Sequence, residues 1–337
     1  MFSLRQLDLH PRIIGALNKA GIRSVRDVLR VSAPDLQRLT SLSAGDVRHL
    51  LTAAALHCRP RRPLPVLKAE ETGVTLSLGC PLLDRLMRGG LPVGAVTELS
   101  GESGVGKTQL ALQLCLSVQY PARHGGLDSG AVFVCTEDAF PGKRLRQLIG
   151  EQPRLRPDLP ADVTSGPGFG DRVYVEHAPD LASLQQCLRR RVALLLARGL
   201  VRFVAIDSVA SLFRSELGPA DWQERSKELM ALSATLRHLC QQYNPAVLCI
   251  NQVTDIFSGS QEYSGPSWSD VCPALGLAWA NQVTVRLMLR RLGRTVSRGG
   301  RDSALRRLEV VFAPHLPRAG RHAAVWKEGV RGLEGDD

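Results

Sequence analysis

Apolar residues recur at helical spacing through the first 57 residues of the chain. These positions are Ile13, Ile14, Leu17, Val25, Val28, Leu29, Leu36 and Leu39. Such spacing places apolar side chains on one face of each of several short helices. Ser24, Ser32 and Ser43 stand where helix N-caps are expected, and Pro34 suits a first helical turn. Residues 1–57 are therefore predicted to form a small helical domain.

From residue 76 onward, short apolar runs alternate with helical stretches. The predicted strands are 96–99, 131–135, 173–175, 203–206 and 247–250, and the predicted helices are 109–116, 181–197 and 222–242. Apolar strands that alternate with helices are typical of a mostly parallel sheet that helices cover on both faces. We therefore predict an α/β core over residues 76–337. Residues 58–75 carry three prolines and no periodicity, which indicates a linker.

Two segments of the core depart from this alternation. Residues 151–170 are rich in proline and glycine, and we expect them to form an exposed excursion. After residue 282, the longer strand-like runs 283–289 and 308–312 flank the basic segment 290–307. This pattern predicts an antiparallel hairpin with a basic tip.

A glycine-rich motif follows the strand predicted at 96–99. Residues 101–108 fit G-x-x-x-x-G-K-[ST], the phosphate-binding loop of nucleotide-hydrolysing enzymes. Glycines let successive backbone N–H groups point at phosphate oxygens, the lysine adds a positive charge, and the threonine hydroxyl can ligate Mg²⁺. The predicted nucleotide-binding residues here are Gly101, Glu102, Ser103, Gly104, Val105, Gly106, Lys107, Thr108 and Gln109.

Polar residues at the ends of other predicted strands complete the candidate site. Asp207 follows the run 203–206 and is the candidate second anchor for Mg²⁺, although an aspartate there can also cap the next helix. Glu137 follows 131–135 and could orient the attacking water or be a solvated loop acid. Asn251 and Gln252 follow 247–250, where an amide can sense a γ-phosphate or cap a turn.

Composition narrows the class of protein only slightly. A net charge of +11 makes nucleic acid a plausible partner without selecting it. The eight cysteines form no C-x-x-C pair, so we expect reduced, buried thiols. No stretch is apolar enough to suggest a secretory signal or a membrane span. Residues 59–63 could be a nuclear-import patch or merely a charged linker.

The motifs, in their order along the chain, resemble the RecA-like strand-exchange recombinases, specifically the eukaryotic branch and its paralogues. Besides the phosphate loop, the matching segments are 78–84, 89–91, 136–137, 206–208, 251–253, 279–281 and 313–317. Three further runs, 11–14, 135–141 and 329–332, narrow the likeness to one recombinase paralogue. The first 57 residues resemble a helix-hairpin-helix domain, which could contact DNA or protein.

The resemblance implies roles for individual residues. Lys107 would hold phosphates, Thr108 and Asp207 would hold Mg²⁺, Glu137 would orient water, and Gln252 would report the γ-phosphate. Arg144 matches a position that packs on adenine, and Pro314 lies in a segment that caps ATP bound by an adjoining subunit. The implied cofactors are ATP and Mg²⁺.

The chain departs from the family pattern in the two loops that hold single-stranded DNA. In the first loop, about 213–225, Leu217 and Ala220 replace a tyrosine and an arginine. The second loop, about 254–274, contains no lysine or arginine, so it lacks the cations that dominate nonspecific DNA affinity. Its aromatic residues, Phe257, Tyr263 and Trp268, could stack on bases or pack against a partner.

The linker and the cap segment depart from the pattern as well. Residues 58–73 contain no aromatic residue, whereas self-polymerising recombinases insert a Phe-x-x-Ala segment from the linker into a neighbour. Ala313 replaces an acid in the cap segment. We therefore do not expect long filaments of this chain alone.

The predicted basic hairpin could supply the positive charge that the second DNA loop lacks. It carries eight arginines near a single acid, Asp302: Arg286, Arg290, Arg291, Arg294, Arg298, Arg301, Arg306 and Arg307. Such a segment can be a solvated face, a protein contact or a DNA-backbone contact.

Together these features predict a slow, DNA-dependent ATPase that acts as an accessory factor of homologous recombination and double-strand break repair. By resemblance we expect a heterodimer with the C-type recombinase paralogue, contact with the main recombinase, and binding to single-stranded or branched DNA. We expect a nuclear protein with an additional cytoplasmic pool and no membrane association. The alternatives are a self-sufficient filament-forming recombinase and an ATP-stabilised, non-catalytic scaffold. A P-loop kinase is disfavoured because no arginine-rich lid follows the core.

Overall fold

The computed structural model describes residues 4, 7, 9–58, 73–165, 168–215, 222–255 and 271–334. The chain divides into two compact units, Met1–Thr72 and Gly73–Asp337. Most of the predicted linker, both predicted DNA loops in their central parts, and the candidate import patch lie outside the described residues.

The first unit is a bundle of short helices. Its helices are α1 (Pro11–Lys19), α2 (Val25–Arg30), α3 (Ala33–Thr40) and α4 (Ala44–Cys58). The predicted caps are confirmed: Ser24 forms a reciprocal capping box with Asp27, Ser32 caps α3, and Ser43 accepts the backbone N–H of Asp46.

Not all of the apolar residues that were predicted to face the core of this unit are buried. Leu17, Val28 and Leu36 are fully buried, but Leu29 and Leu39 are 45% and 57% exposed. A helix of six to eight residues turns only one narrow stripe inward, so the neighbouring apolar residue faces solvent.

The second unit is built around one nine-stranded sheet, within the described residues. In spatial order the strands are β13 (Val330–Gly332), β12 (Gly320–Val325), β11 (Arg301–Phe312), β10 (Val285–Arg298), β3 (Val96–Gly101), β7 (Ala246–Asn251), β6 (Val201–Asp207), β4 (Gly130–Cys135) and β5 (Val173–His177). The six strands from β10 to β5 are parallel, whereas β10 to β13 pair antiparallel. The predicted mostly parallel sheet is confirmed.

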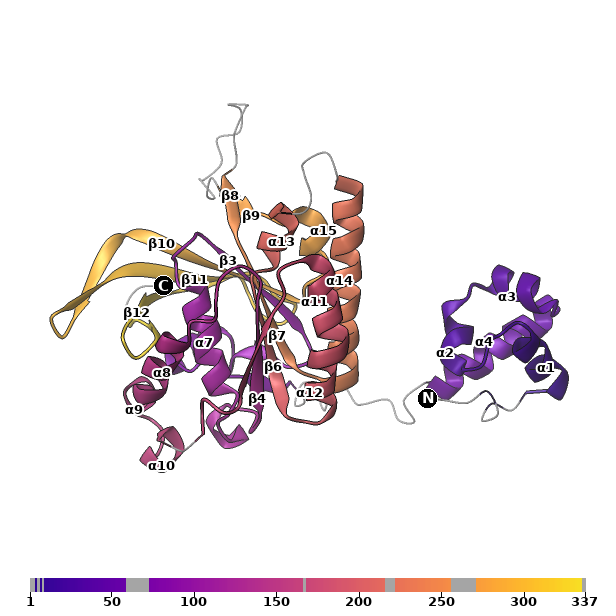
Figure 1. The fold of residues 1–337 in the computed structure, drawn as a ribbon, viewed down its shortest axis with the longest axis horizontal. Helices are drawn as coiled ribbons and strands as arrows, with labels where there is room; N and C mark the ends of the chain where they lie inside the picture. The colour runs from indigo at the N-terminus through magenta and orange to yellow at the C-terminus, as the bar shows by residue number, and fades with distance from the viewer. Residues whose placement is uncertain are drawn as a thin grey trace. The chain divides into compact units, whose positions relative to one another are not determined.

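Helices cover both faces of the parallel strands (Figure 1). On one side lie α7 (Lys107–Ser117) and α8 (Gly142–Gly150), and on the other lie α11 (Leu181–Cys187), α12 (Ala193–Ala197), α13 (Val209–Ser215) and α14 (Trp222–Tyr243). Along β4 the side chains alternate between these layers: Phe133 packs on the α7 side, and Val132 and Val134 pack on the α14 side. This double burial explains why the strands read as continuous apolar runs.

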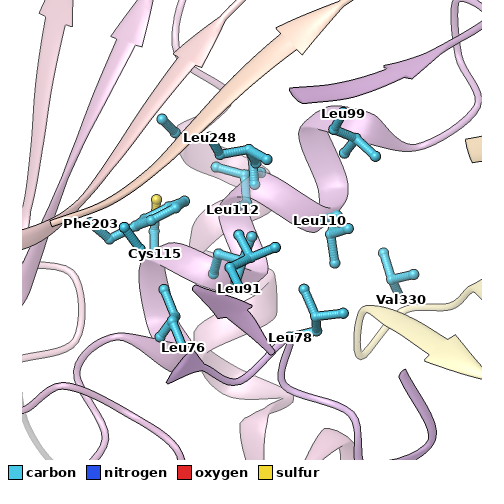
Figure 2. Close-up of a cluster of buried hydrophobic side chains, with 14 of the residues drawn as sticks. Leu76, Leu78, Leu91, Leu99, Leu110, Leu112, Cys115, Phe203, Leu248 and Val330 are labelled. Carbon is cyan, nitrogen blue, oxygen red and sulfur yellow. The ribbon is translucent and has the colours of Figure 1, made fainter. Parts of the chain in front are cut away.

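Helix α7 is buried from Leu110 to Ser117, which fixes the phosphate loop at its start. Leu110, Leu112 and Cys115 lie among side chains of the sheet, including Leu99, Phe203 and Leu248, as Figure 2 shows. The short strands β1 (Thr75–Leu76) and β2 (Leu91–Pro92) close the same cluster.

The described residues of 151–170 are only partly the exposed excursion that their composition suggested. They contain the short helices α9 (Gln152–Leu155) and α10 (Ala161–Thr164). Gln152, Leu155 and Arg156 are at most 5% exposed. Pro153 lies in the first turn of α9 and Pro160 is the N-cap of α10, positions that proline tolerates, so the prolines do not prevent these helices.

The predicted basic hairpin is present, but its strands are longer than predicted. Strands β10 and β11 run to Arg298 and from Arg301, and Gly299 and Gly300 make the turn at positive φ. The hairpin extends beyond the helix-covered sheet (Figure 1). Its outer half carries no apolar alternation because it covers no core, so apolar periodicity could not reveal it.

The remaining described elements are α6 (Pro81–Leu86), a 3₁₀ turn at Ala122–His124, a π-helical turn at Leu188–Val192 between α11 and α12, α15 (Gly276–Ala280), and the two-stranded ribbon of β8 (Val253–Asp255) and β9 (Val271–Pro273). Nowhere in the described residues is a helix both long and apolar enough to cross a membrane.

Candidate nucleotide-binding site

The glycine-rich loop joins β3 to α7 at the carboxyl end of the parallel strands. Gly101 and Gly106 have positive φ values of 157° and 115°. A Cβ atom on Gly101 would lie 2.3 Å from the carbonyl oxygen of Leu289, so a larger residue cannot be accommodated without moving β10. The loop conformation therefore depends on glycine at this position.

Lys107 is the first residue of α7 and is only 8% exposed. Its Nζ atom donates hydrogen bonds of 2.7 Å to the carbonyl oxygens of Gly101 and Glu102. Burial lowers the pKa of Lys107, and the carboxylates of Asp207 and Glu102 oppose this shift. The ammonium group is thus held inside the loop, where its charge can act on phosphate oxygens.

Thr108 and Asp207 come together across the base of the loop. The Thr108 hydroxyl donates a 2.6 Å hydrogen bond to Oδ2 of Asp207 at the end of β6. Burial raises the pKa of Asp207, while the Thr108 hydrogen bond and the Lys107 charge lower it. One hydroxyl and one carboxylate suit Mg²⁺, which takes a few protein ligands and completes its shell with water and phosphate oxygens. The described residues contain no group of three or more His, Cys, Asp and Glu that could hold a metal.

These side chains line a cavity of about 430 Å³. From the predicted set it is lined by Ser103, Gly104, Gly106, Lys107, Thr108, Gln109, Glu137, Asp207 and Gln252. The sequence reasoning missed Phe133, Cys135, Asp138, Ala139, Pro141, Ser208 and Ile250. All seven lie in, or directly after, the last three residues of the strands whose polar residues were predicted, or in the loop that follows, so the strand ends themselves were the available signal.

Three predicted residues of the loop do not line the cavity. Gly101 and Glu102 face Lys107 through their carbonyl groups. Val105 is fully buried, and its carbonyl oxygen accepts a 2.6 Å hydrogen bond from Nε of Arg306. These three residues therefore stabilise the conformation of the loop through their carbonyl groups and do not face the cavity.

Glu137 lies two residues beyond β4 at the mouth of the cavity. Its carboxylate forms a 3.4 Å ion pair with Arg214, and both side chains are nearly half exposed. The carboxylate is therefore near the cavity but engaged with a second group.

The two amides after β7 are separated. Gln252 lines the cavity, whereas Asn251 is 1% exposed and lies outside the lining. Asn251 donates from Nδ2 to Glu98 and accepts from the backbone N–H of Gln252. Of the two amides, only Gln252 is placed to meet a bound ligand.

Arg144 of α8 does not line the cavity either. Its guanidinium donates to the carbonyl oxygens of Trp326 and Lys327, both at 2.8 Å, and to Oε1 of Gln109 at 2.6 Å. It contacts the cavity only through Gln109, which does line it.

The local sequence suggested that the eight hairpin arginines lack acidic partners, but four of them form ion pairs in the structure. Arg286 pairs with Glu98, Arg290 and Arg307 pair with Glu309, and Arg298 pairs with Glu328. Arg291 and Arg306 bind carbonyl groups of the phosphate loop. Of these eight arginines, only Arg294 and Arg301 have neither an ion pair nor a side-chain hydrogen bond to the described residues. The acidic partners Glu98, Glu309 and Glu328 all lie outside residues 286–307, so counting the charges within that segment could not find them.

A glycine-rich loop with a buried lysine, opposite an aspartate that ends β6, the second parallel strand away from β3 in the same sheet, defines a RecA-like P-loop protein. The chain belongs to the Rad51 family: the Rad51 family model matches residues 70–333. A second family model, the XRCC3/RpoA-like helix-hairpin-helix domain, matches residues 4–58. Both resemblances drawn from the sequence, to the recombinase family and to a helix-hairpin-helix domain, are confirmed.

Similar proteins narrow the relationship further. The chain is 50% identical to the DNA repair protein XRCC3 of Bos taurus, over 98% of each chain. It is 47% identical to XRCC3 of Mus musculus, also over 98% of each chain. It is 32% identical to the DNA repair protein rhp57 of Schizosaccharomyces pombe, over 94% of this chain and 95% of that protein.

Proposed function

We propose that this protein binds ATP with Mg²⁺ and acts as an accessory factor in the repair of DNA double-strand breaks by homologous recombination. Its role in DNA repair and recombination follows from its membership of the Rad51 family and its likeness to XRCC3 over nearly the whole chain. That role belongs in the nucleus, and the cytoplasmic pool stays part of the proposal.

The observation that carries the nucleotide assignment is the pairing of Thr108 with Asp207 beside the buried Lys107. Thr108 and Asp207 would hold Mg²⁺, and Lys107 would neutralise phosphate charge. Bound Mg²⁺ would supply positive charge that offsets the negative charge of the phosphates. Gln252 would respond to the γ-phosphate, and Arg144 would support the adenine side of the cavity through Gln109.

We propose that hydrolysis is slow and that a partner subunit accelerates it. Glu137 would orient the attacking water, but its ion pair with Arg214 must first open. The proposed partner is the C-type recombinase paralogue, in a heterodimer with ATP near the subunit interface. Contact with the main recombinase and with single-stranded or branched DNA belongs to the same proposal.

Co-purification with the C-type paralogue, sized by light scattering with and without ATP and Mg²⁺, tests this function. A discrete heterodimer that forms only with nucleotide supports it, and Lys107→Ala should then disperse the heterodimer. Polydisperse homopolymers with no preference for that partner would favour a self-sufficient recombinase instead.

The Glu137–Arg214 ion pair also supports a second candidate, a non-catalytic scaffold that uses ATP for stability alone. The two functions differ in the response to Glu137→Gln. An ATP-hydrolysing factor should lose turnover and repair in cells, whereas a scaffold should keep repair and partner binding.

A further inference from the structure

A second cavity, of about 670 Å³, lies apart from the nucleotide pocket and shares no lining residue with it. Its walls come from α6, the 3₁₀ turn Ala122–His124 and the residues that follow α9. The 3₁₀ turn follows α7 and leads into β4, so the cavity is at the amino end of the parallel strands. The phosphate loop is at the opposite, carboxyl end.

A buried arginine lines this second cavity. Arg156 is 5% exposed and lies with its guanidinium carbon 5.6 Å from the ring centre of Tyr120. Its Nε and Nη2 atoms donate to Asp158 at 2.9 and 2.8 Å, and Nη2 also approaches the carbonyl oxygen of His124 at 3.4 Å. The remaining terminal nitrogen, Nη1, is buried without a hydrogen-bond partner among the described residues. The Asp158 pair and the Tyr120 ring hold this guanidinium in a fixed position in the wall of the cavity, where its positive charge adds to that of the other lining arginines.

Three further arginines, Arg85, Arg88 and Arg123, line the cavity and are exposed. Within the described ranges none of them has a carboxylate partner; Arg123 donates only to the neighbouring His124.

The two acids of the cavity are already engaged. Asp84 accepts hydrogen bonds of 2.6 Å from the Ser77 hydroxyl and the Leu78 N–H, and Asp158 is paired with Arg156. Four arginines against two carboxylates leave the cavity with a formal charge of +2.

We propose that this arginine cavity binds a phosphorylated serine or threonine side chain of a protein partner. A phosphomonoester has about two negative charges and three acceptor oxygens near neutral pH, which match the excess charge of the cavity and the exposed guanidinium donors of Arg85, Arg88 and Arg123. Guanidinium groups recognise phosphate through paired N–H donors, and clusters of arginines are the usual device for binding phosphopeptides.

The shape of the site favours a single side chain over a nucleic-acid strand. The arginines converge on one recess and include a buried member, whereas a strand needs a row of cations that follows its backbone. A DNA phosphodiester also carries only one negative charge, which leaves part of the cavity charge unmatched.

The test uses the full chain and a fluorescein-labelled peptide pool of degenerate sequence with one fixed central residue. Three pools carry phosphoserine, serine or aspartate at that position, and fluorescence anisotropy gives their affinities. We expect the phosphoserine pool to bind at least about tenfold more tightly than the other two, since charge-assisted hydrogen bonds are lost in those pools. Equal binding of the three pools would overturn the proposal.

Variants locate the site and avoid disturbing the buried Arg156. Arg88→Ala and Arg123→Ala should each weaken phosphoserine binding about tenfold, whereas Arg198→Ala, an exposed arginine outside the cavity, should not. Lys107→Ala should leave this binding intact because it alters only the nucleotide pocket. Loss of binding in Lys107→Ala alone would assign the phosphate to the nucleotide pocket and contradict the proposal. Equal displacement by single-stranded DNA, with the same dependence on Arg123, would assign the cavity to DNA instead.

Discussion

Asn251 donates a 2.6 Å hydrogen bond from Nδ2 to Oε1 of Glu98, a carboxylate that is completely buried in β3. The other carboxylate oxygen of Glu98 accepts a 2.6 Å bond from Nε of Arg286 in β10. Asn251 also accepts the backbone N–H of Gln252. A continuous polar chain therefore connects the base of the hairpin to Gln252 in the wall of the nucleotide cavity.

We expect Glu98→Gln to lower the free energy of unfolding by about 3–5 kcal/mol, because breaking a buried ion pair leaves Arg286 without its counter-charge. Urea denaturation measures this loss. Glu309→Gln is the matched control: that carboxylate pairs with Arg290 and Arg307 near the surface, where ion pairs contribute about 0–1 kcal/mol. Similar losses of unfolding free energy in the two variants would contradict a special contribution of the buried Glu98–Arg286 ion pair to stability.

Asp207→Asn should remove most of the stabilisation that ATP and Mg²⁺ give to the protein. At a nucleotide concentration of about 100 times Kd, a ligand stabilises the folded state by about 2.7 kcal/mol. Thermal unfolding with ATP and Mg²⁺ should therefore show a clear increase in Tm for the unmodified chain and for the exposed control Asp162→Asn, but not for Asp207→Asn. EDTA should abolish the increase in the unmodified chain and in Asp162→Asn; an increase that persists in EDTA would show that the nucleotide binds without metal.

Without nucleotide, Asp207→Asn should instead raise the stability of the protein. Burial raises the pKa of Asp207 above its ordinary value of 3.8, so the folded state holds this proton more tightly than the unfolded chain. The ionised carboxylate then costs stability at neutral pH, and the cost disappears as the pH falls through the folded pKa towards 3.8. Asp207→Asn should unfold at a higher Tm than the unmodified chain at pH 7.5, by a margin that shrinks as the pH is lowered towards 4. A margin that does not change with pH would mean that ionisation of Asp207 is not the cause.

The sequence predicted the parts of this fold that local pattern controls. The strands of the parallel sheet, the glycine loop, and the caps at Ser24 and Ser32 all follow from spacing or from a short motif. Lys107, Thr108 and Asp207 were predicted together because parallel strands bring their carboxyl ends to one edge.

Long-range partners could not be predicted in this way. Asn251 looked equivalent to Gln252, and only the position of Glu98 on the adjacent strand shows which amide points into the core. The hairpin arginines looked unpaired because Glu98 and Glu328 lie outside their segment. Burial of Gln152 and Arg156 depends on contacts with Tyr120 and His124 in the segment after α7, which composition does not encode.

The six cysteines whose side chains the structure describes are all buried and free, in agreement with the sequence prediction. Burial mainly, and then the Asp207 and Asp138 carboxylates, raise the pKa of Cys135 to about 11. At pH 8 only about 0.1% of this group would be thiolate, against about a quarter of an ordinary cysteine. We expect iodoacetamide to modify native Cys135 at least about a hundredfold more slowly than the unfolded chain, as measured by peptide mass spectrometry. Equal rates would show that the strand end opens readily.

The hairpin arginines should separate into two functional groups. Arg306 is 8% exposed and donates to the carbonyl oxygen of Val105, and Arg291 donates to that of Gly104 at 3.0 Å, so the base of the hairpin supports the phosphate loop. Arg306→Ala leaves a buried carbonyl without its donor, and we expect it to lower the free energy of unfolding by about 1–3 kcal/mol and to weaken ATP binding. Urea denaturation and a nucleotide titration measure both effects.

The tip arginines Arg294 and Arg301 are exposed, so replacing both with serine should change the free energy of unfolding by less than about 0.5 kcal/mol. We expect the tip to bind the DNA backbone. The double variant should then bind single-stranded DNA more weakly, and the slope of log K against log salt concentration should become shallower by about 0.7 for each phosphate that the protein no longer neutralises. A weaker interaction with the partner subunit at an unchanged salt slope would instead identify the tip as a protein-binding surface, because counterion release from DNA would then play no part in the weakening.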